Sequence, residues 1–167
     1  DAERRTFMEF ISRESARLTS IVDALLNVAR LDTGDLSVSL VSTDVASVVT
    51  DVVSVAGASA NGHHLVADVG AEPLAAQADP EKLRQVLDQL VSNAVKYSPA
   101  GATVSVSAQR RHDTVEVAVA DEGVGIPAAE QERIFAKFYK ASGAQGTGLG
   151  LFIAQGLVRE MGGKIWV

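Results

Sequence analysis

The sequence predicts an α/β fold: a two-layer sandwich with helices on one face of a mixed β-sheet, preceded by a long N-terminal helix. The 167 residues, 47% of them hydrophobic, are enough for one core of about 100 to 150 residues plus an appendage. Strand-like and helix-like periods are mixed without regular βαβ alternation, which favours a mixed sheet. The first segment, 3–31, is amphipathic and contains no glycine or proline.

The segment 3–31 is predicted to be one long helix that ends at Asp32, Thr33 and Gly34. Its apolar residues form a narrow heptad stripe, which favours a partner helix in a hairpin or bundle. The alternative is a solitary core helix of a globular domain. The stripe consists of Phe7, Ile11, Leu18, Ile21, Leu25 and Val28.

The next stretch mixes strands and a helix. Alternating residues at 36–41 and 64–69 predict two strands, and a shorter strand is expected at 75–78. Between the first two strands, Asp44 is predicted to begin a valine-rich helix that ends near Asn61.

The segment 79–97 is predicted to be a helix, because Asp79 is a good N-cap and Pro80 suits the first helical position. Its apolar stripe consists of Leu83, Val86, Leu87, Leu90, Ala94 and Tyr97. Four polar residues spaced four, four and three apart lie in one row beside this stripe. The row is either a wall of a polar pocket or a solvated helix face. An Asn oxygen can bind Mg²⁺ and a Lys ammonium can neutralise a phosphate. The row consists of Gln85, Gln89, Asn93 and Lys96.

The last third of the chain predicts a hairpin, a helix and a strand. Segments 103–110 and 114–121 alternate as strands joined across His112 and Asp113. A helix is expected from about Gly148 to Gly162, followed by a strand at 164–167.

Two glycine clusters flank about twenty residues of polar and aromatic chain. The first, Gly123 and Gly125, follows a predicted strand, and the second, Gly146, Gly148 and Gly150, opens a predicted helix. Such glycines mark backbone with positive φ or close approach by another molecule. At a helix N-terminus, free N–H groups and the helix dipole favour a phosphate.

Asp121 continues the period of two set by Val115, Val117 and Val119 in the preceding strand. Its carboxylate is therefore expected to point inward, to the same face as these valines. A buried carboxylate needs a donor, and the amino group of a purine is suitable. The alternative is an aspartate that ends the strand in a turn.

Composition excludes several classes of function. A net charge of −6 argues against a nucleic-acid or anionic-membrane surface. The absence of cysteine excludes disulfides, thiolate metal sites and cysteine nucleophiles. No apolar run approaches the roughly 20 residues that span a bilayer, so no direct membrane contact is expected of this chain.

Four segments in order resemble the N, G1, F and G2 boxes of bacterial sensor histidine kinases, which bind ATP on the Bergerat fold shared with gyrase and the Hsp90 chaperones. They are QLVSNAVKYS at 89–98, DEGVGI at 121–126, FAKF at 135–138 and GTGLGL at 146–151. Residues 17–35 look like the end of the second helix of the family's dimerisation hairpin. The resemblance thus implies a partial hairpin at 1–34 and a catalytic ATP-binding domain at 35–167.

The resemblance implies roles for individual residues. Asn93 would bind Mg²⁺ with Gln89 behind it, Lys96 would contact a phosphate, and Tyr97 would lie near the base or ribose. Residues 126–145 would form a lid over ATP. Phe135 and Phe138 would anchor this lid, and Arg133, Lys137 and Lys140 would be its candidate cations for the γ-phosphate. The other implied nucleotide contacts are Asp121, which would accept the adenine amino group, and Gly123, Gly125, Ile126, Phe138, Lys140, Gly146, Thr147, Gly148, Leu149 and Gly150.

Two departures from the family's pattern affect the expected chemistry. Gln89 stands where the family usually has Asn and its ATP-hydrolysing relatives have Glu, and Gln cannot accept a proton from water. The phosphoacceptor box is also absent, since His63, His64 and His112 lie at strand ends or in a turn. We therefore expect poor hydrolysis, and an acceptor histidine upstream of this chain or on another protein.

The predicted function is the ATP-binding catalytic domain of a sensor histidine kinase. It would transfer the γ-phosphoryl group of Mg-ATP to a histidine, from which it passes to an aspartate of a response regulator. The parent protein would be a homodimer through its hairpin and would work in the cytoplasm, with or without a membrane anchor.

Three other functions remain open at this point. A serine kinase of the anti-sigma-factor type shares the ATP fold, although the helix at 3–31 argues against it. A degenerate nucleotide-binding interaction module would fit Gln89 and the short, weakly charged lid. A hydrolysing chaperone or topoisomerase domain is disfavoured, since Gln89 is not Glu.

Overall fold

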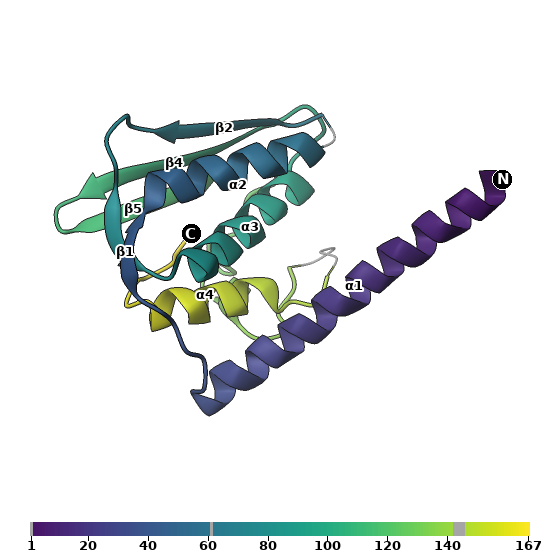
Figure 1. Ribbon diagram of the computed structural model, residues 1–167, viewed down its shortest axis with the longest axis horizontal. Helices are drawn as coiled ribbons and strands as arrows, with labels where there is room; N and C mark the ends of the chain where they lie inside the picture. The colour runs from purple at the N-terminus through teal and green to yellow at the C-terminus, as the bar shows by residue number, and fades with distance from the viewer. Residues whose placement is uncertain (1, 61, 142–145) are drawn as a thin grey trace.

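A long helix, α1, extends from a body in which helices pack over one face of a small β-sheet (Figure 1). The computed structural model describes residues 2–60, 62–141 and 146–167. The elements in chain order are α1 (Ala2–Thr33), β1 (Val41–Asp44), α2 (Val45–Ser59), β2 (His64–Val69), β3 (Ala75–Ala78), α3 (Pro80–Tyr97), β4 (Thr103–Arg111), β5 (Thr114–Ala120), the 3₁₀ turn η1 (Arg133–Phe135) and α4 (Gly150–Glu160).

The main sheet has the strand order β2-β4-β5, with β2 parallel to β4 and β4 antiparallel to β5. Val104, Val106 and Ala108 of the central strand β4 are buried, whereas Ser105 and Ser107 between them are only half-buried. One face of the sheet therefore carries the core under α2 and α3. Strands β1 and β3 form a separate antiparallel pair. These findings confirm the predicted mixed sheet with helices on one face.

Two capping aspartates begin the helices that the sequence predicted. The Asp44 carboxylate accepts the Ala46 N–H, and the Asp79 carboxylate accepts the N–H groups of Glu81 and Lys82. Asp79 also accepts the Ser39 N–H at 2.9 Å, which ties the segment after α1 to the start of α3. The Ser39 bond is the largest cause of a lowered Asp79 pKa, because backbone donors stabilise the ionised carboxylate.

Two apolar clusters pack against neighbouring parts of the apolar face of α3. The first joins α2, α3 and the sheet and is built on Val45, Val48, Val49, Val52, Val53, Leu87, Val91, Val106 and Ala108. The second joins the end of α1 to α3 and α4 and is built on Val28, Leu36, Val86, Leu149, Ile153, Ala154 and Leu157. Val91 belongs to the first cluster and is buried, although it lay outside the expected stripe.

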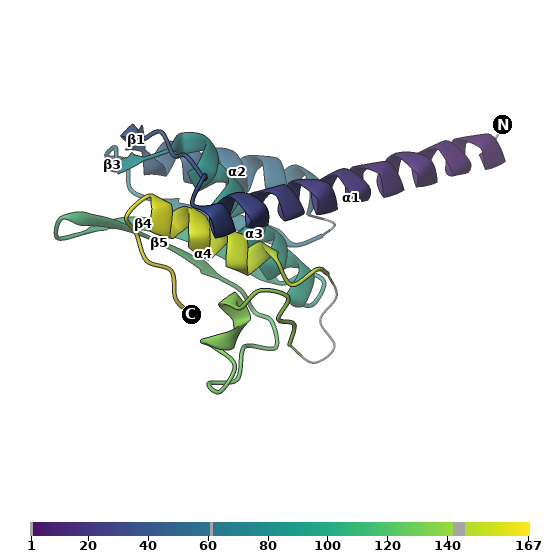
Figure 2. The same cartoon turned by 90° about the horizontal axis from the view of Figure 1, so that it is seen from below.

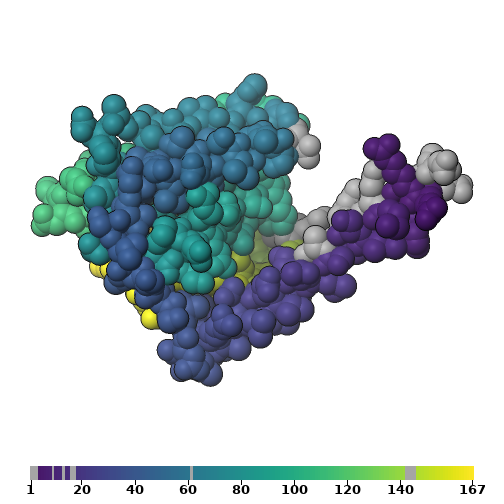
Figure 3. Space-filling view, in the orientation of Figure 1, coloured from purple at the N-terminus to yellow at the C-terminus, as the bar shows by residue number. Residues whose placement is uncertain are grey.

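The N-terminal part of α1 stands clear of the body (Figure 3). Most of its large apolar side chains are exposed, whereas Val28 near its end is buried. The helix ends as predicted, with Gly34 at a φ of 72° and the Asp35 N–H donating to the Arg30 carbonyl at 2.9 Å. No helix in the described ranges combines the length and the apolar character needed to cross a membrane. The exposed residues are Phe7, Met8, Phe10, Ile11, Leu18, Val22, Leu25 and Leu26.

Two predicted strands were wrong. The strand expected at 36–41 begins only at Val41, because Leu36 and Val38 pack onto the α1/α4 cluster and the Ser39 N–H bonds Asp79. Residues 164–167 are described and form no strand. Ile165 packs on the same cluster, and no described strand pairs with this segment. In both places, alternation reflects contact with helices.

Candidate functional site

The glycine-rich loop 146–150 lies along the polar row of α3, in the opposite direction. The Lys96 ammonium lies 3.6 Å from where a Cβ on Gly146 would stand. At the other end of the row, a Cβ on Gly150 would lie 2.4 Å from the side-chain carbonyl carbon and oxygen of Gln89. The loop and the row therefore form two sides of one site, and a side chain at position 150 would displace the Gln89 carboxamide.

Gln89 and Asn93 are linked within the row. The Gln89 side-chain N–H donates to the Asn93 Oδ1 at 3.1 Å, and both side chains are half-buried. The extra methylene of Gln89 lets its amide touch both Asn93 and Gly150. This contact orients the Asn93 carboxamide oxygen, the atom to which the resemblance assigns Mg²⁺.

Lys96 and Tyr97 end the row at the last turn of α3. The Lys96 ammonium donates to the Tyr97 hydroxyl at 3.1 Å and lies 4.8 Å from the centre of its ring. Tyr97 is partly exposed, although the sequence placed it in the core stripe. That expectation was wrong because α3 ends beside the loop 121–125, not under the sheet.

The first glycine pair packs against the end of α3. A Cβ on Gly123 would lie 2.7 Å from Asp121 Oδ1 and 2.8 Å from the Tyr97 carbonyl oxygen, so a side chain cannot be accommodated. Gly125 has a φ of 70°, a conformation that favours glycine. These two glycines bring Asp121 close to the polar end of α3.

Asp121 is exposed, and the prediction of a buried carboxylate was wrong. Strand β5 ends at Ala120, one residue before it, and Asp121 Oδ1 accepts the Gly123 N–H at 2.8 Å. The aspartate thus ends the strand in a turn, which is the alternative that its sequence left open. Its carboxylate still faces the same loop as the two glycines.

The middle of the second glycine loop is held by the lid. The Phe138 N–H donates to the Gly148 carbonyl at 3.0 Å. A Cβ on Gly148 would come within 2.7 Å of the Phe138 carbonyl carbon and the Tyr139 oxygen, and Gly148 has a φ of 70°. Phe138 itself has a φ of 63°, which is strained for a side-chain-bearing residue. We call this contact between Phe138 and Gly148 the strap.

Helix α4 begins at the end of the glycine loop without a side-chain cap. The Leu149 N–H points to Thr147 Oγ1 at 3.4 Å, and the first turn contains no acidic residue. Leu149 is fully buried, so only its backbone can serve a ligand. Free N–H groups and the helix dipole make this end of α4 attractive to an anion.

The described part of the lid, residues 126–141, projects beside α4 as a separate arm (Figure 2). Phe135 is buried and anchors it as expected, but the Phe138 side chain is exposed and anchors only through the backbone. Ile126 is half-buried and Lys140 is exposed. Residues 142–145, which complete the predicted lid, lie outside the described residues.

Two of the three candidate lid cations contact protein groups. Lys137 pairs with Asp32 of α1, and the Arg133 guanidinium lies 4.8 Å from the centre of the Tyr139 ring. Burial is the largest cause of a raised Tyr139 pKa, followed by the Glu130 carboxylate, so this phenol stays neutral at physiological pH.

The three histidines lie where the sequence predicted. His64 begins β2 and is exposed, and His112 is exposed in the β4–β5 turn. His63 is half-buried, with its Nδ1 2.9 Å from the Ala60 carbonyl oxygen. In the described ranges, no three His, Cys, Asp or Glu side chains gather to hold a metal ion.

Residues 78–167 match the family described as histidine kinase-, DNA gyrase B-, and HSP90-like ATPase. The chain belongs to this family. The matched segment contains α3, both glycine clusters and the strap, so every element of the site lies within the ATPase domain. The family also fits the glycine positions, since Gly123 and Gly148 lie against backbone atoms that leave no room for a side chain.

Similar proteins of this ATPase family are sensor kinases. The sensor-like histidine kinase SenX3 of Mycolicibacterium smegmatis is 34% identical over 174 residues, covering 96% of this chain and 44% of its own length. The structure of full-length ShkA in complex with AMPPNP has a TM-score of 0.86 and 30% identity, covering 99% of this chain and 36% of that one.

The structure of histidine kinase ThkA in complex with the response regulator TrrA shares the fold. Its TM-score is 0.75 at 22% identity, and the match covers 96% of this chain and 46% of that one. The curated sensor kinases are longer than this chain, which spans between 27% and 46% of their length. The chain therefore matches one part of longer sensor histidine kinases, and that part contains the ATPase domain together with α1.

Proposed function

We propose that this chain binds Mg-ATP between α3 and the glycine loop and presents its γ-phosphoryl group to a histidine outside the chain. The observation that carries the proposal is the alignment of loop 146–150 with the polar row, from Lys96 at Gly146 to Gln89 at Gly150. The backbone N–H groups of this loop then face the polar row of α3, which ends in the Lys96 ammonium. Such an arrangement suits the phosphate chain of a nucleotide.

The adenine end of the proposed site lies at the 121–125 loop. Asp121 has an exposed carboxylate that can accept the adenine amino group, while Gly123 lets the loop lie directly against α3. Tyr97 stands beside this loop, with its ring partly exposed for contact with the base or ribose. Guanine has a carbonyl at the position of the adenine amino group and would meet the same carboxylate unfavourably.

The phosphate end of the proposed site contains the N-terminus of α4, Lys96 and Asn93. The N–H groups of the loop would contact phosphate oxygens, and Lys96 and the exposed Lys140 would supply positive charge. Asn93 would hold Mg²⁺, which supplies charge neutralisation on the phosphates when it is bound. Ile126 and Phe138 would lie along the lid side of the nucleotide.

Gln89 makes this site better suited to transfer than to hydrolysis. Its side-chain N–H already donates to Asn93 Oδ1, and an amide cannot take a proton from water. Catalysis would therefore rest on positioning and charge neutralisation, with an imidazole nitrogen as the attacking group. The phosphoryl group would then pass to an aspartate of a response regulator.

The parent protein is proposed to dimerise through a helical hairpin to which α1 belongs. The exposed apolar side chains of α1 need a partner helix, and the Lys137–Asp32 contact marks where residues 1–34 meet the domain at 35–167. ThkA, which shares the fold, is a histidine kinase seen with a response regulator. A response regulator is accordingly proposed as the partner here, and the cytoplasm as the site of action.

Asn93→Ala tests the proposed role of this residue directly. We expect the variant to lose the Mg²⁺-dependent part of its affinity for a fluorescent ATP analogue while it keeps its circular dichroism spectrum. Asn27→Ala, on α1 and away from the site, is the matched control. Wild-type affinity in Asn93→Ala, with wild-type Mg²⁺ dependence, would remove Asn93 from the site.

The acceptor is tested in a longer protein that carries this chain behind its upstream segment. Radiolabel from γ-labelled ATP should appear on that protein in an acid-labile, base-stable form, because phosphohistidine hydrolyses in acid. Acid-stable label would instead support the serine kinase.

A further inference from the structure

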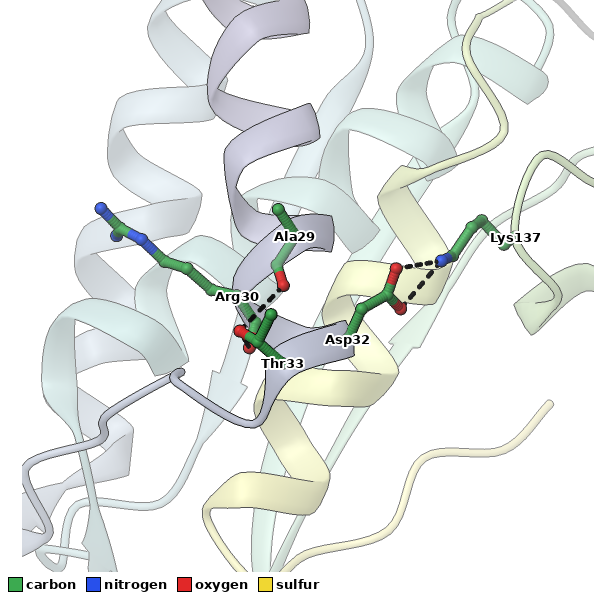
Figure 4. A network of polar contacts seen from close by, with 5 residues as sticks. All are labelled: Ala29, Arg30, Asp32, Thr33 and Lys137. Atoms are coloured by element: carbon green, nitrogen blue, oxygen red, sulfur yellow. Dashed lines mark hydrogen bonds and ion pairs between the residues drawn. The ribbon is translucent and has the colours of Figure 1, made fainter.

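Lys137 of the lid contacts two helices, α1 and α4. Its ammonium lies 2.8 Å from Oδ1 and 2.6 Å from Oδ2 of Asp32, at the end of α1 (Figure 4). The same ammonium lies 5.1 Å from the centre of the Phe152 ring on α4. A charged lid residue thus joins the lid to α1 and α4, outside the proposed nucleotide site.

Asp32 stands where a carboxylate is unfavourable for its own helix. It is the last residue but one of α1, next to the negative end of the helix dipole. The terminal carbonyls there already accept bonds, from Thr33 Oγ1 to Ala29 and from the Asp35 N–H to Arg30. The ammonium of Lys137 compensates this excess of negative charge, so the ion pair is favoured at this position.

The end of α1 is fixed to α4, which gives Lys137 a firm partner. Leu31 packs directly on Gly156, where a Cβ would come within 2.6 Å of both Leu31 methyl carbons. Val28 and Leu36 on either side belong to the same apolar cluster as Leu157 of α4. Asp32 therefore sits on a docked part of α1, unlike the projecting N-terminal part.

The position of Lys137 is transmitted to the glycine loop by a single peptide unit. The next residue, Phe138, forms the strap to Gly148 through its N–H. Phe138 has a φ of 63° and Gly148 has no room for a side chain, so the two backbones are in close contact. A shift of Lys137 would move the strap, and with it the middle of the glycine loop.

We propose that Lys137 is a positioning residue that couples the end of α1 to the nucleotide site through the strap. The coupling rests on the proposed function, since the site it acts on is the proposed ATP site. Coupling between two sites is reciprocal. Nucleotide binding should therefore change the exchange of amides at 28–35, although these residues do not belong to the proposed site.

The test is a charge-swap cycle read out by hydrogen exchange and nucleotide titration. Lys137→Glu and Asp32→Lys each replace attraction by repulsion, and the double variant restores an ion pair in reverse. In the chain without nucleotide, each single variant should exchange the amides of 135–141 several-fold faster. Affinity for a fluorescent ATP analogue should fall about two- to fivefold, the range for a partly exposed pair. The double variant and Lys137→Arg should both lie near the wild type.

Asp23→Lys and Lys164→Glu are matched controls that make the same changes of charge at exposed positions on α1 and near the C-terminus. Both should behave as wild type in both measurements. If Lys137→Glu fails to fold, Lys137→Ala removes the pair without repulsion and takes its place in the cycle.

Each outcome decides the proposal. Wild-type amide exchange at 135–141 in both single variants would overturn the proposal. So would a double variant that binds the ATP analogue no more tightly than Lys137→Glu, because that result would indicate direct contact of Lys137 with the phosphates. If the wild type binds no nucleotide but the exchange pattern follows the cycle, the proposed function is wrong and the tether between α1 and the lid stands.

Discussion

The layer of α2, α3 and the sheet is held together differently from the lid and its glycine loop. The first region is an apolar cluster in which Val49, Leu87 and Val106 are almost entirely buried. The second region depends on a few point contacts: buried Phe135, the strap, and the Lys137–Asp32 pair. The difference separates two tasks, because the packed layer fixes Asn93 and the point contacts leave the phosphate side adjustable.

Truncating the packed layer should have the largest effect on stability. Leu87→Ala removes a side chain from the cluster of α2, α3 and the sheet, and should lower the free energy of unfolding by about 2–5 kcal/mol. Urea denaturation, monitored by circular dichroism, measures this loss of free energy of unfolding. Val124→Ala, at a residue that is 94% exposed, should change stability by less than about 0.5 kcal/mol. Similar losses in the two variants would contradict the division into two regions.

Gly148→Ala should damage the site more than the fold. The added methyl would strike Phe138 and Tyr139 and would also disfavour the φ of 70°, so the strap must shift. We expect affinity for a fluorescent ATP analogue to fall by about tenfold or more, the equivalent of about 1.4 kcal/mol.

Gly162→Ala is the matched control for Gly148→Ala. Gly162 has a φ of 78° at the opposite end of α4, and nothing lies within 4 Å of its would-be Cβ. It carries the same backbone strain without the collision, so its nucleotide affinity should equal that of the wild type. Equal losses of affinity in the two variants would show that strain alone, and not the strap, explains the effect.

Removing the cap of α3 should have a smaller effect that depends on pH. Asp79→Ala should lower the free energy of unfolding by about 0.5–2 kcal/mol at pH 7. The folded-state pKa of Asp79 is lowered, so its stabilisation is present above the unfolded pKa, near the ordinary 3.8, and is lost as the pH falls through the folded value. Urea denaturation between pH 7 and pH 2.5 should show the free energies of unfolding of the wild type and Asp79→Ala becoming equal in acid. A constant difference would rule out the charge of Asp79 as the cause.

The local elements of this fold were predictable because their signals are local. Asp44, Asp79 and Pro80 mark helix starts, and alternation marks β2, β4 and β5. The errors lie where distant contacts override a local pattern. Leu36 and Val38 alternate as in a strand but pack against α1 and α4. Asp121 continues the alternation of β5 in sequence, but the strand ends at Ala120 and the Asp121 side chain bonds the following turn.

The site was predictable in its parts but not in its connections. Glycine spacing and the polar row of α3 both pointed to a phosphate site, and the structure brings them together. The contact of Gln89 with Gly150 spans two elements, and the Lys137–Asp32 pair joins residues 105 apart in sequence. Neither carries a local signal, although an aspartate near the end of α1 is a charge in need of a partner.

A competition titration tests the central claim that Asp121, Asn93 and the glycine loop form an ATP site. A fluorescent ATP analogue is bound to the wild type and to Asp121→Asn, with and without Mg²⁺, and displaced by ATP or by GTP. We predict Mg²⁺-dependent binding to the wild type that ATP displaces and GTP does not, and a loss of this preference in Asp121→Asn. Displacement of the analogue by GTP as readily as by ATP, or no binding up to millimolar concentrations, would contradict the account.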